Sequence, residues 1–343
     1  MILAAGLLVW KWDRIKGFLN KEERTINPVE VKLLFREDPD LEDLSLLLFE
    51  EGIIASPDVF TDFVKENGLS TDYAAGKYVI LSGTRIADLA HGFEKNAEGN
   101  GNSEVKVNVV FNRCRDLYDV GDQISKCILA DSASIVDYAL DQETLSKYGF
   151  TKEQLPALFI PGSYEMYFDL TAEQFVAEMA AKFREFWNDE RKQKMTAIGL
   201  KSPSQVVTLA SIVYSEQGKV PEEWSTIAAL YLNRLKKGMR LQSDPTFKFC
   251  WGDKLDGVQR LLAKHRDIDC PYNTYKIDGL PPGPICLVPA EVIDAVLMPD
   301  DVNYLYMCAK PDYSGEHNFT ASDAQHIRNA RVYQNWLSRN NMR

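Results

Sequence analysis

Apolar residues in the first part of the chain fall into short runs typical of strands and into helical spacing. Val31 to Phe35 predicts a strand, and Leu41 to Leu48 predicts a helix whose leucines share one face. Ser56-Pro57 is a start signal for a second helix, Gly68 ends it, and Tyr78 to Leu81 predicts a second strand. The pattern therefore predicts a strand–helix–helix–strand unit.

Helical spacing dominates the middle of the chain. Its most amphipathic stretch runs from Thr171 to Trp187, where Thr171 can cap the helix and Gln174 completes a capping box. Val105 to Phe111 alternates as a strand does. We also expect a loop over Asn96–Ser103, helices after Ser82-Gly83-Thr84 and over Val120–Leu129, a polar helical stretch up to Gly149, and a turn over Phe159–Tyr164.

Turn residues become dense in the last hundred positions. Gly279 to Pro284 concentrates glycine and proline, which fixes a loop at low entropic cost. The pattern predicts an extended or looped stretch over Arg240–Thr246, a helix over Ala290–Leu297, a strand over Tyr304–Ala309 and a final helix over Ala321–Trp336. Taken together, these elements predict the α+β class.

The most apolar helical segment carries one carboxylate at its far end. Ser202 is a suitable N-cap, Pro203 fits the first helical position and Gln205 completes a capping box. The run Val206 to Val213 is almost entirely apolar, and Glu216 follows it. The helix dipole and the apolar neighbours both raise the pKa of such a carboxylate, as a general acid near neutral pH requires.

The same local pattern also fits a solvated glutamate that closes a helix, and taken alone it favours that interpretation. A second helix follows, opened by Pro221 and ended by Gly238. The motifs beyond that helix decide between the two interpretations.

Composition indicates an ordinary globular protein with an acidic balance. The chain has 343 residues, enough for two or more domains, of which 45% are apolar and 26% charged. A formal net charge of −11 argues against a nucleic-acid-binding surface, which would be basic. Carbohydrate substrates stay open, because sugar sites use aromatic and amide groups.

The first residues are typical of part of a membrane anchor. Ile2 to Trp10 is apolar but shorter than the ~20 residues that span a bilayer. Trp10-Lys11-Trp12 is an aromatic and basic group of the kind found at a membrane interface. We expect residues 1–12 to be the end of a transmembrane segment that begins upstream. A short buried element is the alternative, and a cleaved signal peptide is disfavoured because no basic stretch precedes the run.

The cysteines form no CxxC pair, which disfavours a zinc site or thioredoxin-like chemistry. They are Cys114, Cys127, Cys250, Cys270, Cys286 and Cys308. For most of them the expected state is a buried thiol without chemistry. In an extracytoplasmic protein some would pair, and about 15 connectivities are then possible.

Several motifs follow one another between residues 210 and 306. They are Ala210-Ser211-Ile212-Val213 with Glu216, Asn233-Arg234-Leu235, Gly238 to Thr246, Tyr272-Asn273-Thr274-Tyr275, Gly279 to Ile285, and Tyr304-Leu305-Tyr306. In this order they resemble the endolytic murein transglycosylases, the YceG-like family. Residues 31–100 and His317–Phe319 match that family more loosely.

Three features depart from the family pattern. The family carries two acidic residues after Ala-Ser-Ile-Val, whereas Tyr214 stands at the first of these positions, so the catalytic glutamate falls on Glu216. Pro161 to Tyr164 replaces a more acidic pattern, so no substrate role is expected there. The stretch Cys250–Cys270 differs from family members and is expected to be a variable loop.

The resemblance implies an architecture and a location. Residues 30–100 would form a LysM-like module, and residues 101–343 a mixed α+β lytic transglycosylase domain with its core motifs in 202–320. A single anchor would hold the enzyme in the inner membrane, with the catalytic domain in the periplasm. The expected partners are peptidoglycan glycan strands, peptidoglycan synthases and other elongation or division proteins, and no nucleic acid.

The implied reaction cleaves the β-1,4 bond between N-acetylmuramic acid and N-acetylglucosamine within nascent glycan strands, which terminates or trims elongation. It leaves a 1,6-anhydro end instead of a hydrolysed reducing end. Glu216 would act as acid and then as base toward the sugar's own C6 hydroxyl, so one carboxylate suffices. No metal ion or organic cofactor is expected.

Six motif residues are candidates for substrate binding: Asn233, Gln242, Asp244, Tyr272, Asn273 and Tyr275. We expect the three amides to hydrogen-bond acetamido and hydroxyl groups, and the two tyrosines to stack on sugar faces. Asp244 would orient Gln242 or Arg240, or cap a turn. For Asn233 and Asp244 a purely structural role is equally open, and His317 is expected to be structural.

Two other functions stay open at this point. A lysozyme-like hydrolase would need a second carboxylate about 5–10 Å from the first, for which Asp244 is the candidate. A non-catalytic wall-binding or scaffold protein would have no glycan cleavage for a Glu216→Gln substitution to remove.

Overall fold

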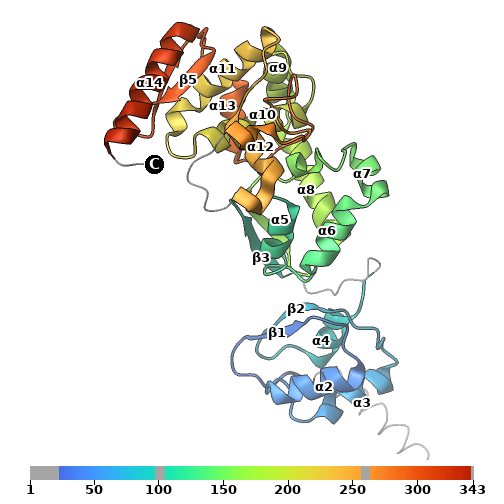
Figure 1. Cartoon of the computed structure of the whole chain (residues 1–343). Helices are drawn as coiled ribbons and strands as arrows, with labels where there is room; N and C mark the ends of the chain where they lie inside the picture. Colours follow the sequence, from blue (N-terminus) through green and yellow to red (C-terminus); the bar gives the residue numbers. More distant parts are fainter. Residues whose placement is uncertain (1–22, 97–104, 256–262, 341–343) are drawn as a thin grey trace, which may run out of the picture. The chain divides into compact units, whose positions relative to one another are not determined.

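The computed structural model describes residues 23–96, 105–255 and 263–340, and the chain divides into two compact units (Figure 1). The first unit comprises Met1–Val109, Ile124–Asp131 and Tyr164–Thr171, and the second comprises Val110–Gln123, Ser132–Ser163 and Ala172–Arg343. The domain boundary expected at residue 100 lies outside the described residues.

The first unit has the predicted order of strand, helix, helix and strand. Strand β1 (Val31–Phe35) pairs antiparallel with β2 (Gly76–Ile80), and Leu33 lies opposite Tyr78. Helices α2 (Leu41–Glu50) and α3 (Pro57–Asn67) connect the two strands, and α4 (Ile86–Phe93) follows. Gly68 ends α3 in the left-handed conformation, which is why glycine suits that position.

An aromatic core holds this unit together. Phe35, Tyr78 and Phe93 are buried and meet edge to face, and their ring centroids are 4.6–6.1 Å apart. The Tyr78 hydroxyl donates to the Ala74 carbonyl at 2.6 Å, so its burial leaves no hydroxyl unpaired. Each buried aromatic side chain contributes roughly 2–3 kcal/mol of hydrophobic stabilisation to the folded unit.

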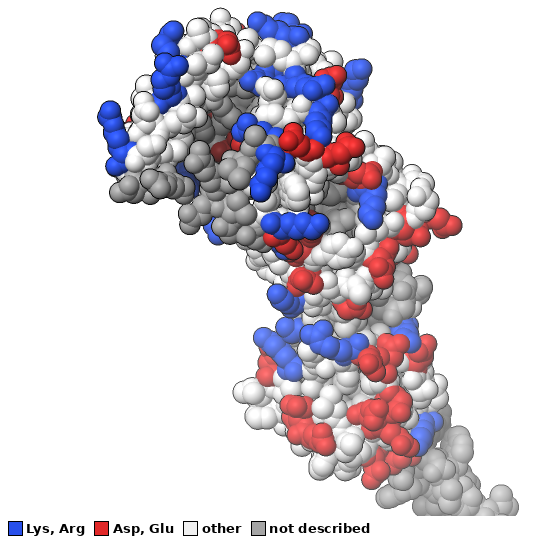
Figure 2. All heavy atoms as spheres, in the orientation of Figure 1, with Lys and Arg blue, Asp and Glu red and all other residues white. Residues whose placement is uncertain are grey.

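The surface of the first unit is acidic. Residues 23–96 contain 15 aspartates and glutamates against 7 lysines and arginines. Figure 2 shows acidic side chains spread over the face of this unit that is in view. Because like charges repel, such a surface disfavours the approach of polyanions.

The rest of the described chain is mainly helical. Its elements are β3 (Lys106–Phe111), α5 (Leu117–Ile124), α6 (Ser132–Leu140), α7 (Gln142–Tyr148), η2 (Leu155–Leu158), β4 (Gly162–Tyr167), α8 (Ala172–Phe186), α9 (Asp189–Ala197), α10 (Pro203–Glu216), η3 (Pro221–Glu223), α11 (Trp224–Lys236), α12 (Asp244–Trp251), η4 (Gly252–Leu255), η5 (Ala263–Asp267), α13 (Ala290–Leu297), β5 (Tyr306–Ala309), β6 (His317–Thr320) and α14 (Asp323–Arg339). Strands β3 and β4 form one two-stranded sheet, and β5 and β6 form another. The predicted α+β class is confirmed.

Helix α10 is the centre of the second unit. Every residue from Val206 to Val213 is buried, because a helix that is apolar on all sides must be covered on all sides. Helices α9, α11, α12 and α13 and the 3₁₀ turn η2 pack around it. Ser202 caps its start as predicted, since its hydroxyl accepts from the Gln205 backbone N–H at 3.3 Å.

The structure corrects three of the expected elements. Helix α12 (Asp244–Trp251) takes up the end of the stretch Arg240–Thr246, of which only Arg240–Ser243 is non-helical as expected. Strand β4 (Gly162–Tyr167) begins within the stretch Phe159–Tyr164, where a turn was expected. The predicted helix over Val120–Leu129 starts earlier, at Leu117, and ends at Ile124. Pro245 lies in the first turn of α12, where proline favours the start of a helix, so the sequence does contain a signal for this helix.

One disulfide joins Cys250, near the end of α12, to Cys270, a pairing that the sequence pattern could not select. The free thiols are Cys114, Cys127, Cys286 and Cys308. The expected anchor at residues 1–12 and the expected loop at Asn96–Ser103 lie at least in part outside the described residues. Within the described part of the chain, no helix is both long and apolar enough to cross a bilayer.

The proline- and glycine-rich loop packs backbone against backbone at Gly283. A Cβ at this position would lie 1.8 Å from the carbonyl oxygen of Glu153. Only glycine permits this close approach, so the loop and the turn before η2 are held at a fixed separation.

We expect Gly283→Ala to lower the free energy of unfolding by about 2 kcal/mol or more, because the loop and the turn must separate. Urea unfolding followed by tryptophan fluorescence measures the change. Gly218→Ala is the matched control, since its Cβ would meet only the Tyr214 carbonyl oxygen at 3.8 Å. Equal stability of the two variants would contradict the steric argument.

Candidate active site

Glu216 is the last residue of α10, as predicted. The N-cap at Ser202 fixes where the helix begins, and the covered apolar run fixes its direction. Gln217 leaves the helix, and its backbone N–H still donates to the Val213 carbonyl at 3.0 Å. The Glu216 side chain is therefore carried by a rigid and deeply packed element.

Two hydroxyl groups donate to the same oxygen of Glu216. The Tyr231 hydroxyl of α11 donates to Glu216 Oε1 at 2.8 Å, and the Ser243 hydroxyl donates to Oε1 at 2.5 Å. Tyr231 and Ser243 are 2% and 1% exposed, so both donors are fixed by the surrounding protein. Within the described part of the chain, no side chain or backbone N–H donates to Oε2, which leaves this oxygen available to a ligand.

Burial raises the pKa of Glu216 above its usual value. The hydrogen bonds from Ser243 and Tyr231 oppose this shift, and the negative charge of Asp244 adds to it. Burial raises the pKa of Tyr231 well above its usual range, so the phenol stays protonated and keeps donating. Burial and the nearby negative charge thus favour the neutral form of Glu216, and the two hydrogen bonds from Tyr231 and Ser243 favour the charged form.

The loop that carries Ser243 is held from two sides. The Ser243 N–H donates to Thr274 Oγ1 at 3.0 Å, and the Gln242 N–H donates to the Thr274 carbonyl at 3.1 Å. The buried Arg234 guanidinium donates to the Leu241 carbonyl at 2.8 Å and the Leu305 carbonyl at 2.6 Å. These contacts hold Gln242 in the left-handed region at φ 52°, a conformation that costs about 1 kcal/mol or more and occurs at functional sites.

Asp244 and Tyr275 lie beside Glu216 and bind each other. The Tyr275 hydroxyl donates to Asp244 Oδ1 at 2.5 Å, and the Arg266 guanidinium forms an ion pair with the same oxygen at 3.3 Å. Arg266 also lies over the Tyr275 ring, 4.8 Å from its centroid. The Asp244 carboxylate therefore has two partners, Tyr275 and Arg266, and the Tyr275 hydroxyl points toward Asp244.

Asn273 and Tyr272 differ in their surroundings. Asn273 is fully buried, and its amide donates to the Arg266 and Ile268 carbonyls at 2.8 Å each. Its Oδ1 accepts from the Tyr275 N–H at 3.1 Å, so every polar group of this side chain has a partner within its own loop. Tyr272 is partly exposed and packs against Phe249, with 4.6 Å between the ring centroids.

Asn233 is engaged away from Glu216. Its Nδ2 donates to the Val302 carbonyl at 2.8 Å and the Tyr304 carbonyl at 3.2 Å. It also lines a cavity of about 1150 Å³ together with Ser204 and Thr208. Thr208 and Glu216 are eight residues apart on α10, which is ~12 Å along the helix. The described structure thus gathers Gln242, Asp244 and Tyr275 near Glu216 and leaves Asn233 elsewhere.

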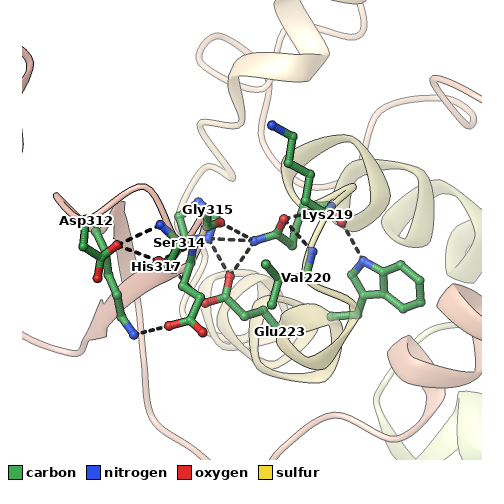
Figure 3. A network of polar contacts seen from close by, with 11 residues as sticks. Lys219, Val220, Glu223, Asp312, Ser314, Gly315 and His317 are labelled. Atoms are coloured by element: carbon green, nitrogen blue, oxygen red, sulfur yellow. Dashed lines mark hydrogen bonds and ion pairs between the residues drawn. The ribbon is translucent and has the colours of Figure 1, made fainter.

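A polar network next to Glu216 was not predicted as part of the site (Figure 3). Gln217 is buried, and its amide donates to Glu223 Oε2 at 2.8 Å and to the Gly315 carbonyl at 2.9 Å. His317 Nδ1 lies 2.7 Å from Glu223 Oε2. The backbone N–H of His317 donates to Glu223 Oε1, also at 2.7 Å. The network holds the residues that follow α10, and His317 takes part in it through two contacts with Glu223.

No three His, Cys, Asp or Glu side chains of residues 23–96, 105–255 and 263–340 are grouped as ligands of one ion would be. The chemistry available from the described side chains is proton transfer by one carboxyl group, steadied by two hydroxyl groups.

The fold and the site define an α+β protein with a glutamate of raised pKa, Glu216, at the end of a buried helix. The chain belongs to the YceG-like family, whose sequence pattern it matches over residues 35–332. A crystal structure of a yceG-like protein from Listeria monocytogenes shares the fold, with a TM-score of 0.53 and 24% identity over 88% of this chain and 99% of that one.

Two proteins named "Endolytic murein transglycosylase" are similar to this chain. The one from Bacillus subtilis is 34% identical over 179 residues, which is 51% of this chain and 47% of that protein. The one from Streptococcus pneumoniae is 22% identical over 325 residues, which is 87% of this chain and 57% of that protein. The chain thus spans about half the length of these relatives.

We expect Ser243→Ala and Tyr231→Phe each to raise the pKa of Glu216 further, because each removes a hydrogen bond that lowers it. A carbon-13 NMR titration of the glutamate carboxyl signals measures the shift, and Glu216→Gln assigns the signal. Ser215→Ala, an exposed serine of the same helix, is the control and leaves the pKa unchanged. A fall of the pKa in Ser243→Ala would contradict the role of its hydroxyl.

The raised pKa of Glu216 also predicts a pH dependence of stability. The folded protein binds this proton more tightly than the unfolded chain, so the stabilisation is present at low pH and is lost as the pH rises through the folded pKa. Glu216→Gln cannot ionise and should therefore gain stability over the wild type as the pH rises. Urea unfolding at about pH 4 and about pH 8 measures the gain, and a difference independent of pH would refute it.

Proposed function

We propose that this protein is an endolytic peptidoglycan lytic transglycosylase that cleaves the β-1,4 bond between N-acetylmuramic acid and N-acetylglucosamine within glycan strands. The observation that carries the proposal is the Glu216 carboxyl group, which has a raised pKa and both of its protein hydrogen bonds on Oε1. Membership of the YceG-like family and the names of the two relatives support the substrate class.

The first step of the proposed reaction is proton donation. Protonated Glu216 presents its proton on Oε2 to the glycosidic oxygen, because Tyr231 and Ser243 occupy Oε1. As the bond between C1 and that oxygen breaks, the proton goes to the leaving sugar, and positive charge develops at C1. The two hydrogen bonds stabilise the carboxylate that this step leaves behind.

The second step returns the proton. The C6 hydroxyl oxygen of the same N-acetylmuramic acid attacks C1, and its proton passes to the Glu216 carboxylate. One bond has broken and one has formed, no water is consumed, and the acid is regenerated with a 1,6-anhydro end as the product. Because the nucleophile belongs to the substrate, no second carboxylate is needed to activate it.

The surroundings of Asp244 support this mechanism over hydrolysis. A retaining or inverting hydrolase needs a second free carboxylate as nucleophile or base. The Asp244 carboxylate is already bound by Tyr275 and Arg266. We assign Asp244 to steadying the start of α12, next to Ser243, and to raising the pKa of Glu216 through its charge.

The other predicted residues divide into two groups. Gln242 is exposed, with a backbone fixed in the left-handed region, and it and the partly exposed Tyr272 and Tyr275 are proposed sugar contacts. Asn273 has all of its polar groups bound within its loop, so its proposed role is to hold Tyr275. Asn233 is proposed to fix the segment before β5 through the Val302 and Tyr304 carbonyls.

The first unit and the cellular setting belong to the same proposal. Its β1–α2–α3–β2 order is that of a LysM-like module, which would hold the enzyme on peptidoglycan. An N-terminal anchor in the inner membrane would place the catalytic unit in the periplasm beside peptidoglycan synthases. There the enzyme would trim or terminate nascent strands, without a cofactor.

We expect Glu216→Gln to reduce glycan-strand cleavage more than about a hundredfold while the fold is kept, because the amide cannot donate the proton. Release of soluble fragments from purified, uncrosslinked strands measures the rate. Glu222→Gln is the matched control, since Glu222 is an exposed carboxylate nearby in the chain and should retain full activity.

Mass spectrometry of the digest separates the competing functions. The proposal requires 1,6-anhydro ends that Glu216→Gln does not produce. Reducing ends would identify a lysozyme-like hydrolase instead. A wild-type protein that binds strands and releases no fragments would be a scaffold, and retained turnover in Glu216→Gln would refute the assignment of the acid.

A further inference from the structure

An aromatic cluster on the surface of the second unit has no role in the proton-transfer chemistry. Tyr313, in the turn between β5 and β6, is 70% exposed. Its ring lies 4.5 Å from that of Trp336 on α14, and the Trp336 ring stacks on Tyr333 with 5.8 Å between centroids. Tyr313 is exposed and Tyr333 and Trp336 are partly exposed, so the three rings form an aromatic patch of the kind found at binding surfaces.

The backbone at Tyr313 is held in an unfavourable conformation. Its φ is 61°, in the left-handed region that a bulky residue rarely adopts. Such a conformation costs about 1–3 kcal/mol and persists only where the surrounding structure enforces it. The fold therefore maintains an exposed tyrosine where a glycine would be easier to accommodate.

Hydrogen bonds within the turn enforce this conformation (Figure 3). Asp312 Oδ1 accepts from the Ser314 N–H at 3.1 Å and from its hydroxyl at 2.6 Å. The Ser314 hydroxyl oxygen accepts from the Glu316 N–H at 3.1 Å, and the Lys310 N–H donates to the Glu316 carbonyl at 2.8 Å. The turn is thus a rigid support for the ring it carries.

The same turn is tied to the residue after Glu216. Gln217 Nε2 donates to the Gly315 carbonyl at 2.9 Å. Tyr313 is two residues from Gly315, so their Cα atoms are at most about 7 Å apart. His317, at the other side of the turn, binds Glu223, which also binds Gln217. The aromatic cluster therefore has a fixed position relative to the reacting carboxyl group.

We propose that Tyr313, Trp336 and Tyr333 form an additional saccharide subsite for the glycan strand that Glu216 cleaves. The inference rests on the proposed function and deepens it. The C–H groups on one face of a pyranose ring make an apolar surface, which packs against the negative face of an aromatic ring. A strand is a chain of such rings, so units beyond the cleaved bond can reach a support at a fixed distance from it.

Binding is tested in the Glu216→Gln background, where strands are not consumed. The probe is a set of purified, uncrosslinked glycan strands of defined length. Tyr313→Gly removes the ring and suits the left-handed backbone, so the protein should fold with unchanged or greater stability. It should bind long strands about tenfold more weakly, a change of ~1.4 kcal/mol. Tyr313→Phe keeps the ring and should keep the affinity.

Tyr118→Ala, which removes another exposed tyrosine, is the matched control and should bind as the parent does. In the otherwise unmodified enzyme, Tyr313→Gly should raise KM for long strands and leave kcat unchanged, since the subsite binds ground state and transition state alike.

Three results would overturn the subsite. Unchanged strand binding in Tyr313→Gly would remove it and leave the proposed function intact. Loss of affinity in Tyr313→Phe would show that the ring face is not what binds. Binding to anionic phospholipid vesicles that depends on Tyr313, with unchanged strand binding, would identify a membrane surface instead. If the Glu216→Gln parent binds no strands at all, the proposed function fails as well.

Discussion

The second unit depends on the two hydrogen bonds that meet at Glu216 Oε1. One comes from Tyr231 in the middle of α11 and the other from Ser243 before α12, so three elements must be correctly packed before both can form. The burial that raises the pKa and the hydroxyl groups that lower it act on the same carboxyl group. Their balance keeps the group protonatable while stabilising the charge that follows proton transfer.

Aromatic packing supports the C-terminal end of α10. The Tyr214 ring lies 6.2 Å from the Trp224 ring, centroid to centroid. The Trp224 Nε1 in turn donates to the Gln217 carbonyl at 2.7 Å. An aromatic contact and a hydrogen bond therefore support the end of α10.

Local signals in the sequence were enough to predict helix α10 and the position of Glu216 at its end. The cap at Ser202, the apolar run and the position of Glu216 all depend on neighbours within a few residues, and the structure confirms them. Ser243 could not be recognised in this way, because its partners lie 27 and 31 residues away in the chain. The same reason hid the network of Gln217, Glu223 and His317, although Pro245 did give a local signal for α12.

The bond between Cys250 and Cys270 has a consequence for how the site is held together. It joins the end of α12 to the loop that supplies Arg266 and Asn273, which between them support Asp244 and Tyr275. Closing a loop of this length lowers the conformational entropy of the unfolded chain, which stabilises the folded state by roughly 3 kcal/mol. Where thiols are kept reduced, that loop is tied by non-covalent contacts alone. In surroundings in which disulfides form, a covalent bond therefore adds to the contacts that hold Arg266 and Asn273 beside Asp244 and Tyr275.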